Sequence, residues 1–102
     1  MKKLSNGKDT GNTSSYSHEV RTTVNDLKRV CGTPTFKEPP EKVSIGWEME
    51  TEDGEVFTIY DWKEYSKPAA RFPNRKVNFH IGARDEKSSL KAQEELLKAL
   101  QS

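Results

Sequence analysis

The fold of this chain is decided by residues 42–62, KVSIGWEMETEDGEVFTIYDW. Every second residue from Val43 to Met49 is apolar, so one face of an extended segment is buried and the other faces water. An acidic centre with a glycine follows, and then a run of β-branched and aromatic residues. This pattern predicts a β-hairpin.

The length of the hairpin loop determines which side chains share a face. A two-residue turn would set Trp47 opposite Tyr60, on one face. A three-residue loop ending in Gly54, with the glycine in the left-handed conformation, instead sets Trp47 opposite Ile59. We predict this second register because it gathers the apolar side chains on one face. It leaves Tyr60 beside the side-chain gap at Gly46.

Length and composition limit the classes of protein to consider. A chain of 102 residues, 31% hydrophobic and 32% charged, has the size of one small domain. Its formal net charge of +1 gives no overall attraction to nucleic acid or to an anionic membrane. It has no apolar run of membrane-spanning length and no leader-like segment, so we expect a cytoplasmic protein without a membrane partner. A single cysteine and two histidines predict no disulfide, metal site or cofactor.

The N-terminal third of the chain is expected to contain a tail and a helix. Residues 1–15 are polar and Gly-containing and predict a disordered tail, followed by a single domain over residues 16–102. Apolar residues at steps of four and three then predict a helix over residues 16–31, ended by Gly32 and Pro34. That stripe consists of Tyr16, Val20, Val24, Leu27 and Cys31, and a serine among Ser14, Ser15 and Ser17 is expected to cap it.

Four further segments complete the expected fold. They are an extended connector over residues 33–41 anchored by Phe36, a long loop over 63–75, a strand over 76–83, and a helix over 86–100 capped by Asp85. The core face of this last helix is expected to carry Leu90, Leu97 and Leu100. Asp61, at a strand end, is expected to accept hydrogen bonds from amides of the loop that follows it.

The elements thus follow the order α-β-β-β-α. We predict an α+β fold, with a three-stranded antiparallel sheet and both helices on one face. The third strand could pair with the second strand or cross to the first, and the bias toward sequential neighbours favours the second.

The long loop and the open sheet face together predict a ligand site. Cations interleaved with aromatic rings suit an anion that carries a planar base, through charge pairing and stacking. The predicted site residues are Tyr60, Trp62, Tyr65, Lys67, Arg71, Arg75, Asn78 and His80. Two simpler interpretations stay open: the charges are an ordinary solvated surface, or the loop folds back so that Phe72 covers Tyr60 and Trp62.

No set of side chains in the sequence has the spacing of a catalytic centre. Cys31 and His80 are expected in different layers of the fold, and paired carboxylates occur only at the exposed hairpin tip, so we predict that the protein is not an enzyme. The acidic tip is an alternative docking surface for a protein.

Three segments resemble small uncharacterised proteins of bacteriophages and mobile elements. They are LKRVCGTPTF at 27–36, VFTIYDWKEY at 56–65 and FHIGA at 79–83. The resemblance implies a phage origin, and it favours an inhibitor in the host cytoplasm over an enzyme. We therefore expect an anti-defence protein that acts as a sponge for a nucleotide-like anionic signal. The alternatives are direct inhibition of a host protein and a small nucleic-acid-binding module. A second subunit over the open face would bury Tyr60 and Trp62, which favours a homodimer.

Overall fold

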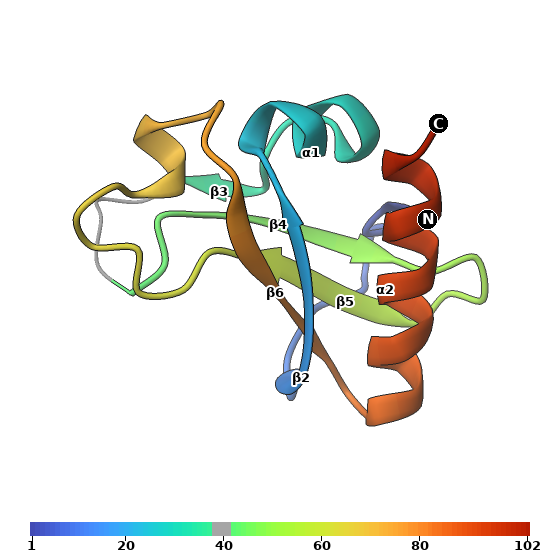
Figure 1. The fold of residues 1–102 in the computed structure, drawn as a ribbon. Coiled ribbons are helices and arrows are strands. Elements are labelled where there is room, and N and C mark those ends of the chain that lie inside the picture. Colours follow the sequence, from blue (N-terminus) through green and yellow to red (C-terminus); the bar gives the residue numbers. More distant parts are fainter. Residues whose placement is uncertain (38–41) are drawn as a thin grey trace.

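A computed structural model describes residues 1–37 and 42–102 and shows an α+β fold (Figure 1). Five antiparallel strands form the sheet in the order β1-β4-β5-β6-β2, and a sixth, β3, pairs with β4. The strands are β1 (Lys2–Lys3), β2 (Ser14–Thr22), β3 (Phe36–Lys37), β4 (Ile45–Glu50), β5 (Val56–Tyr60) and β6 (Val77–Ala83). The helices are α1 (Val24–Cys31), the short 3-10 helix η1 (Ala69–Arg71) and α2 (Glu86–Leu100). Part of the predicted connector, 38–41, lies outside the described residues.

The hairpin of β4 and β5 has the predicted register. Trp47 pairs with Ile59 and Gly46 pairs with Tyr60, as a three-residue loop requires. Gly54 ends that loop with a φ of 84°, a left-handed conformation in which a side chain would be strained. The prediction that the third predicted strand lies beside the second is also confirmed, since β6 pairs with β5.

The prediction of a three-stranded sheet in the order α-β-β-β-α is wrong. Residues assigned to the start of the first helix form β2, which pairs with β6 at the end of the sheet. Val20 and Thr22 point into the core while Glu19 and Arg21 are exposed, which is the alternation of a strand. The apolar spacing misled us because Val20 fits both a helical and a strand period.

Helix α1 is therefore shorter than predicted and has a different cap. It begins at Val24, and the Thr23 side chain accepts a hydrogen bond from the Asp26 amide at 3.1 Å, so none of the three serines caps it. Its end is as predicted. The Gly32 amide donates to the Lys28 carbonyl, and Gly32 has a φ of 81°.

Helix α2 has the predicted bounds and the predicted Asp85 cap, which accepts from the Ser88 amide at 2.7 Å. Its core face is only partly the predicted one. Leu100 packs against the core cluster, whereas Leu90 and Leu97 are 45% and 40% exposed. The buried residues are Ser88, Ser89, Ala92 and Leu96. Ser89 can be buried because its hydroxyl lies 2.8 Å from Nδ1 of His18.

Both helices pack on one face of the sheet, which we call the inner face (Figure 1). One core cluster joins the helix residues to the alternating apolar residues of β4, β5 and β6. Its largest members include Trp47, Phe57, Phe79, Leu27, Ile59, Ile81 and Leu96. The Trp47 indole N–H donates to the Gly32 carbonyl at 2.9 Å, so the one polar group of this buried ring has a hydrogen-bond partner. Among the helices of the described chain, none has the length and apolar character needed to span a membrane.

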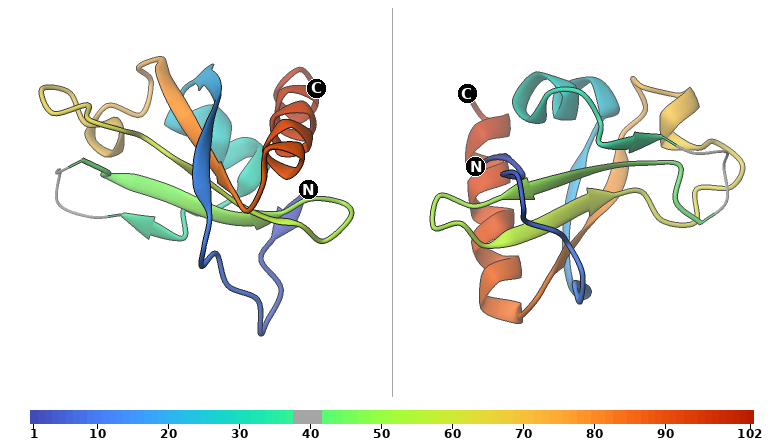
Figure 2. Two further views of the ribbon diagram at one scale, coloured as in Figure 1. Left: turned by 90° about the horizontal axis from the view of Figure 1, so that it is seen from below. Right: turned by 180° about the vertical axis from the view of Figure 1, so that it is seen from behind.

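The first residues of the chain do not form the disordered tail that we predicted. Strand β1 pairs with β4 at one edge of the sheet, and β2 pairs with β6 at the other. Residues 4–13, here called the crossing segment, connect these two edges (Figure 2). They cross the sheet face opposite the helices, which we call the outer face. Thr10 donates there to the Glu48 carboxylate, and Lys8 donates to the Glu50 carboxylate.

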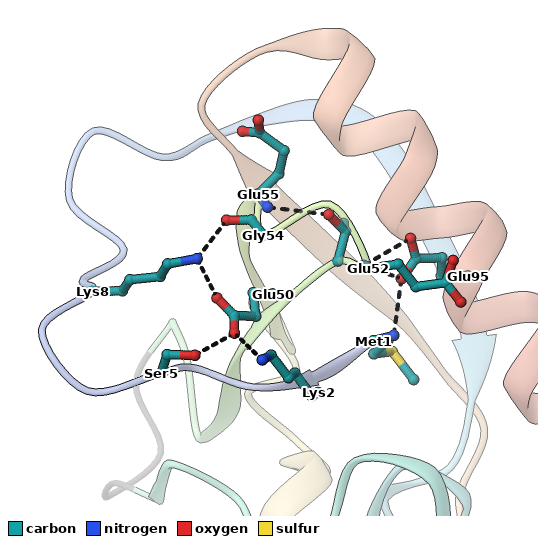
Figure 3. Close-up of polar contacts among 10 residues, drawn as sticks. Met1, Lys2, Ser5, Lys8, Glu50, Glu52, Gly54, Glu55 and Glu95 are labelled. Carbon is teal, nitrogen blue, oxygen red and sulfur yellow. Dashed lines mark hydrogen bonds and ion pairs between the residues drawn. The ribbon is translucent and has the colours of Figure 1, made fainter.

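Glu50 is the main anchor of the crossing segment (Figure 3). Its side chain is 1% exposed, and the ammonium groups of Lys8 and Lys2 lie 2.6 and 3.3 Å from its oxygens. Ser5 donates to the same carboxylate. Hydrogen bonds from Lys8 and Ser5 lower the pKa of Glu50 to about 2. We predicted disorder because residues 1–15 have almost no apolar side chains to bury. Polar contacts from residues 2–8 hold this segment on the sheet instead.

Candidate ligand-binding groove

The outer face contains a groove of about 280 Å³ beside the end of the crossing segment. It is lined by Thr13, Ser14, Phe36, Val43, Thr58, Tyr60, Trp62 and Gly82. Four parts of the chain thus contribute: the end of the crossing segment with β2, β3 with the residues before β4, β5 with Trp62, and β6. We call this the outer-face groove.

Two glycines shape the outer face at this place. A Cβ added at Gly46 would lie 2.2 Å from Cζ of Phe36, so the Phe36 ring lies directly on the backbone of β4. A Cβ at Gly82 would lie 2.6 Å from the Thr58 hydroxyl. Phe36 was predicted to anchor the connector on the core. The structure places it on the outer face instead, paired with Gly46 across β3 and β4.

Three predicted site residues form an aromatic cluster at the groove. The rings of Tyr60 and His80 are stacked, with centroids 5.8 Å apart and planes at 24°. Trp62 meets Tyr60 edge to face at 6.3 Å and lies 6.5 Å from His80. Burial raises the pKa of the Tyr60 hydroxyl, and a hydrogen bond with Ser15 partly opposes that shift. Trp62 remains 38% exposed, so the cluster offers a ring surface to solvent.

Two lysines lie over the Trp62 ring. The ammonium groups of Lys42 and Lys63 are 5.9 and 5.8 Å from its centroid, within the range of cation–π attraction. The Lys63 amide donates to the Lys42 carbonyl at 2.7 Å, which holds the two residues side by side. Lys63 also has a φ of 56°, an uncommon value for a residue with a side chain. Neither lysine was among the predicted site residues.

The remaining predicted site residues lie elsewhere. Tyr65, Lys67 and Arg75 line a second depression of about 240 Å³, together with Lys63, Glu64 and Ser66. Arg75 is already paired there, 2.7 Å from Glu64 and 2.9 Å from the Lys67 carbonyl. Arg71 belongs to η1 and is exposed, and Asn78 accepts from Arg21 at 3.3 Å.

Asp61 holds the loop between β5 and β6 on the inner side. Its buried carboxylate accepts from the Ser44 amide and hydroxyl at 2.7 and 2.6 Å, from the Ile45 amide, and from Ala69 at 3.4 Å. The predicted cap of the following loop is thus present, and it also fastens the start of β4. The loop does not fold back over the groove: Phe72 is 42% exposed and is not among the groove residues.

Two of the five acidic side chains of the hairpin tip, Glu50 and Asp53, form ion pairs with other parts of the chain. Glu50 is held by the crossing segment, and Asp53 lies 2.6 Å from the Lys91 ammonium. Glu95 of α2 accepts from the Glu52 amide and lies 3.1 Å from the amino group of Met1 (Figure 3). The tip therefore presents less free negative charge than its sequence indicated.

Within residues 1–37 and 42–102, no group of three or more His, Cys, Asp or Glu side chains could hold a metal ion. No protein family, curated protein or solved structure matches the chain at a significant level. Several residues at the groove were not predicted because their segments are brought together only by the fold. They are Thr13, Ser14, Phe36, Lys42 and Lys63.

Proposed function

We propose that this chain is a non-catalytic binding protein that takes up a nucleotide-like anion in the outer-face groove. The observation that carries the proposal is the exposed Trp62 ring, with two lysine ammonium groups less than 6 Å from its centroid. A planar base can stack on such a ring, and a phosphate attached to the base meets the adjacent positive charge. Lysine binds phosphate as a point charge without requiring a fixed orientation.

The surroundings of the groove favour this ligand class over a purely apolar one. Tyr60 and His80 continue the ring surface from Trp62, while Thr13, Ser14 and Thr58 supply hydroxyl groups that can pair with a sugar or a phosphate. Pockets for cofactor-like molecules commonly combine apolar walls with a few polar groups. Arg75 contributes less than the sequence suggested, because its guanidinium is engaged by Glu64 and Lys67.

The biological role that we propose is the sequestration of a nucleotide signal in the host cytoplasm. This role follows from the expected resemblance of three segments to small phage proteins, and the comparisons with known proteins add no support to it. A protein that binds a signal molecule without converting it lowers the free concentration of that molecule. Such a groove needs aromatic rings and positive charge, but no catalytic acid or base. The absence of catalytic activity is part of the proposal and stays a prediction.

The direct test is to denature freshly purified protein and record the ultraviolet spectrum and mass of what it releases. Thermal melts with a panel of mono-, di- and cyclic nucleotides complement it. A true ligand should raise the melting temperature in proportion to the logarithm of its concentration. Lys42→Ala combined with Lys63→Ala, and separately Trp62→Ala, should remove that shift while the unliganded protein melts normally.

The matched control is the double variant Arg71→Ala with Arg75→Ala, which removes two positive charges from the long loop. It should keep the ligand-induced shift. If this control loses the shift and the lysine variant keeps it, the ligand lies in the second depression beside Tyr65. If no nucleotide shifts the melt and one host protein is captured instead, the protein acts on that partner directly. Steeply salt-dependent binding to single-stranded RNA or DNA would indicate a nucleic-acid module.

A further inference from the structure

We infer that the free edge of β2 and the adjoining flank of α2 form an interface for a second copy of this chain. β2 is the last strand in the sheet order, so one side of it has no strand partner in the described part of the protein. An edge strand presents backbone N–H and C=O groups in a row and readily adds another strand. Residues 19–21, where we place the pairing, do not line the outer-face groove, although Glu19 lies 3.9 Å from His80 of the aromatic cluster.

The backbone direction of β2 identifies the groups that face outward. Val20 pairs with Phe79 and Arg21 with Asn78 in register with β6. The Glu19 carbonyl accepts a hydrogen bond from Nε2 of Gln93 at 2.9 Å, so it points away from β6. Because this direction alternates along a strand, the backbone groups of Arg21, two residues later, point to the same free side.

Helix α2 adds an exposed apolar flank on the same side. Leu90 and Leu97 lie three residues before and four residues after Gln93, so all three share one side of the helix. Gln93 reaches the edge of β2, whereas Lys91 and Glu95, on the opposite flank, contact the hairpin tip. The exposed leucines that contradicted the predicted core stripe thus lie beside the free strand edge.

The charges on β2 are self-complementary, which favours a second copy of this chain as the partner. In an antiparallel pair related by a two-fold axis at Val20, Glu19 lies opposite Arg21 of the second copy, and the reverse pair forms by symmetry. A register centred on Glu19 or on Arg21 would instead oppose like charges. Glu19 and Arg21 are both exposed, and they point to the outer face.

Pairing in this register has a definite geometry. The Glu19 carbonyl exchanges its hydrogen bond from the Gln93 side chain for one from the backbone amide of Arg21 in the second copy. The irregularity between Ser15 and Glu19 ends the pairing toward the N-terminus of β2. Both sheets become continuous, the Leu90–Leu97 flanks of the two α2 helices face one another, and the two outer-face grooves open on the same side. Pairing at residues 19–21 covers none of the residues that line the groove, so this dimer can be absent while the proposed function holds.

Sedimentation equilibrium of the full chain tests the interface. We expect a species of twice 11.6 kDa that dissociates on dilution. Arg21→Glu and Glu19→Arg should each weaken association by at least about tenfold, because each opposes like charges across the axis. The combined variant Glu19→Arg with Arg21→Glu should restore association, since it exchanges the two signs. Circular dichroism melts establish that each variant is folded.

Leu90→Glu combined with Leu97→Glu should also give a monomer. Lys98→Glu should not, because the exposed Lys98 lies with Met1 and Glu95 on the opposite flank of α2. Three results would overturn the inference: a monomer at every concentration, a dimer unaffected by the Arg21 and leucine variants, or a charge exchange that fails to restore association in a folded protein.

Discussion

At the residue scale, Glu50 connects stability to pH. Its folded-state pKa of about 2 lies below the ordinary value of 4.5, chiefly because Lys8 and Ser5 bond to the ionised form. A depressed carboxyl pKa contributes stability that is fully present above the unfolded value and is lost as the pH falls through the folded value. The free energy of unfolding should therefore decrease between pH 4.5 and about pH 2.

Glu50→Gln should be less stable at neutral pH and should show a flatter dependence in that range, when urea unfolding is followed at a series of pH values. Hydrogen exchange of residues 2–12 should accelerate in the same variant, because the crossing segment loses its main anchor. Glu94→Gln, at an exposed carboxylate of α2, serves as the control. Parallel pH curves for Glu50→Gln and the unchanged protein would show that the carboxylate does not hold the segment.

Gly46 is the residue where the smallest change should have a large effect. A methyl group there would overlap the Phe36 ring, so Gly46→Ala must displace β3 from β4. We expect a loss of about 1–3 kcal/mol, the usual range for overpacking. Chemical unfolding of Gly46→Ala, Phe36→Ala and the double variant forms a mutant cycle. In Phe36→Ala, the added methyl group should cost little, and additive losses would argue against the contact.

At the scale of elements, Asp61 joins the end of β5 to the start of β4 and to η1. Asn in its place keeps the shape but offers one accepting oxygen and turns an NH₂ group toward donors. Because the site is buried, Asp61→Asn should lower the free energy of unfolding by about 2–3 kcal/mol and increase hydrogen exchange over residues 63–75. Asp53→Asn, which breaks an exposed ion pair, should cost less than about 1 kcal/mol. Equal losses in the two variants would contradict this role.

The elements that the sequence predicted well are those with a local signal. The hairpin register followed from Gly54 and apolar alternation, and α2 followed from its Asp85 cap. β2 was missed because Val20, Val24 and Leu27 share helical spacing, although Val20 belongs to a strand and the other two to a helix. The groove was predicted only in part, since Tyr60, Trp62 and His80 share a sheet face but Lys42 and Phe36 arrive from other segments. The contacts of Glu50 have no local trace in the sequence.

At the scale of the whole molecule, residues from the first quarter of the chain supply the terminal strand at each end of the sheet order. β1 reaches β4 and β2 reaches β6, so native pairing joins residues far apart in sequence. Folding must bring these distant segments together before β1 can pair with β4 and β2 with β6. The entropy lost in closing such long loops slows folding. We expect folding in roughly milliseconds to seconds in stopped-flow experiments, slower than in helical proteins of this size. Microsecond folding would contradict this topology-based expectation.

The two tryptophans of the chain occupy opposite sides of the sheet, and this has an optical consequence. Trp47 is fully buried against Phe79, whereas Trp62 is partly exposed beside two ammonium groups. Iodide, an anion, should therefore quench the emission of Trp62 efficiently, while caesium, a cation, should be repelled from it. The difference between the two quenchers should decrease with added salt, because exposed charges are screened. Fluorescence of the unmodified protein thus reads the electric potential at the mouth of the outer-face groove before any ligand is known. Equal quenching by the two ions at low salt would mean that this potential is not positive.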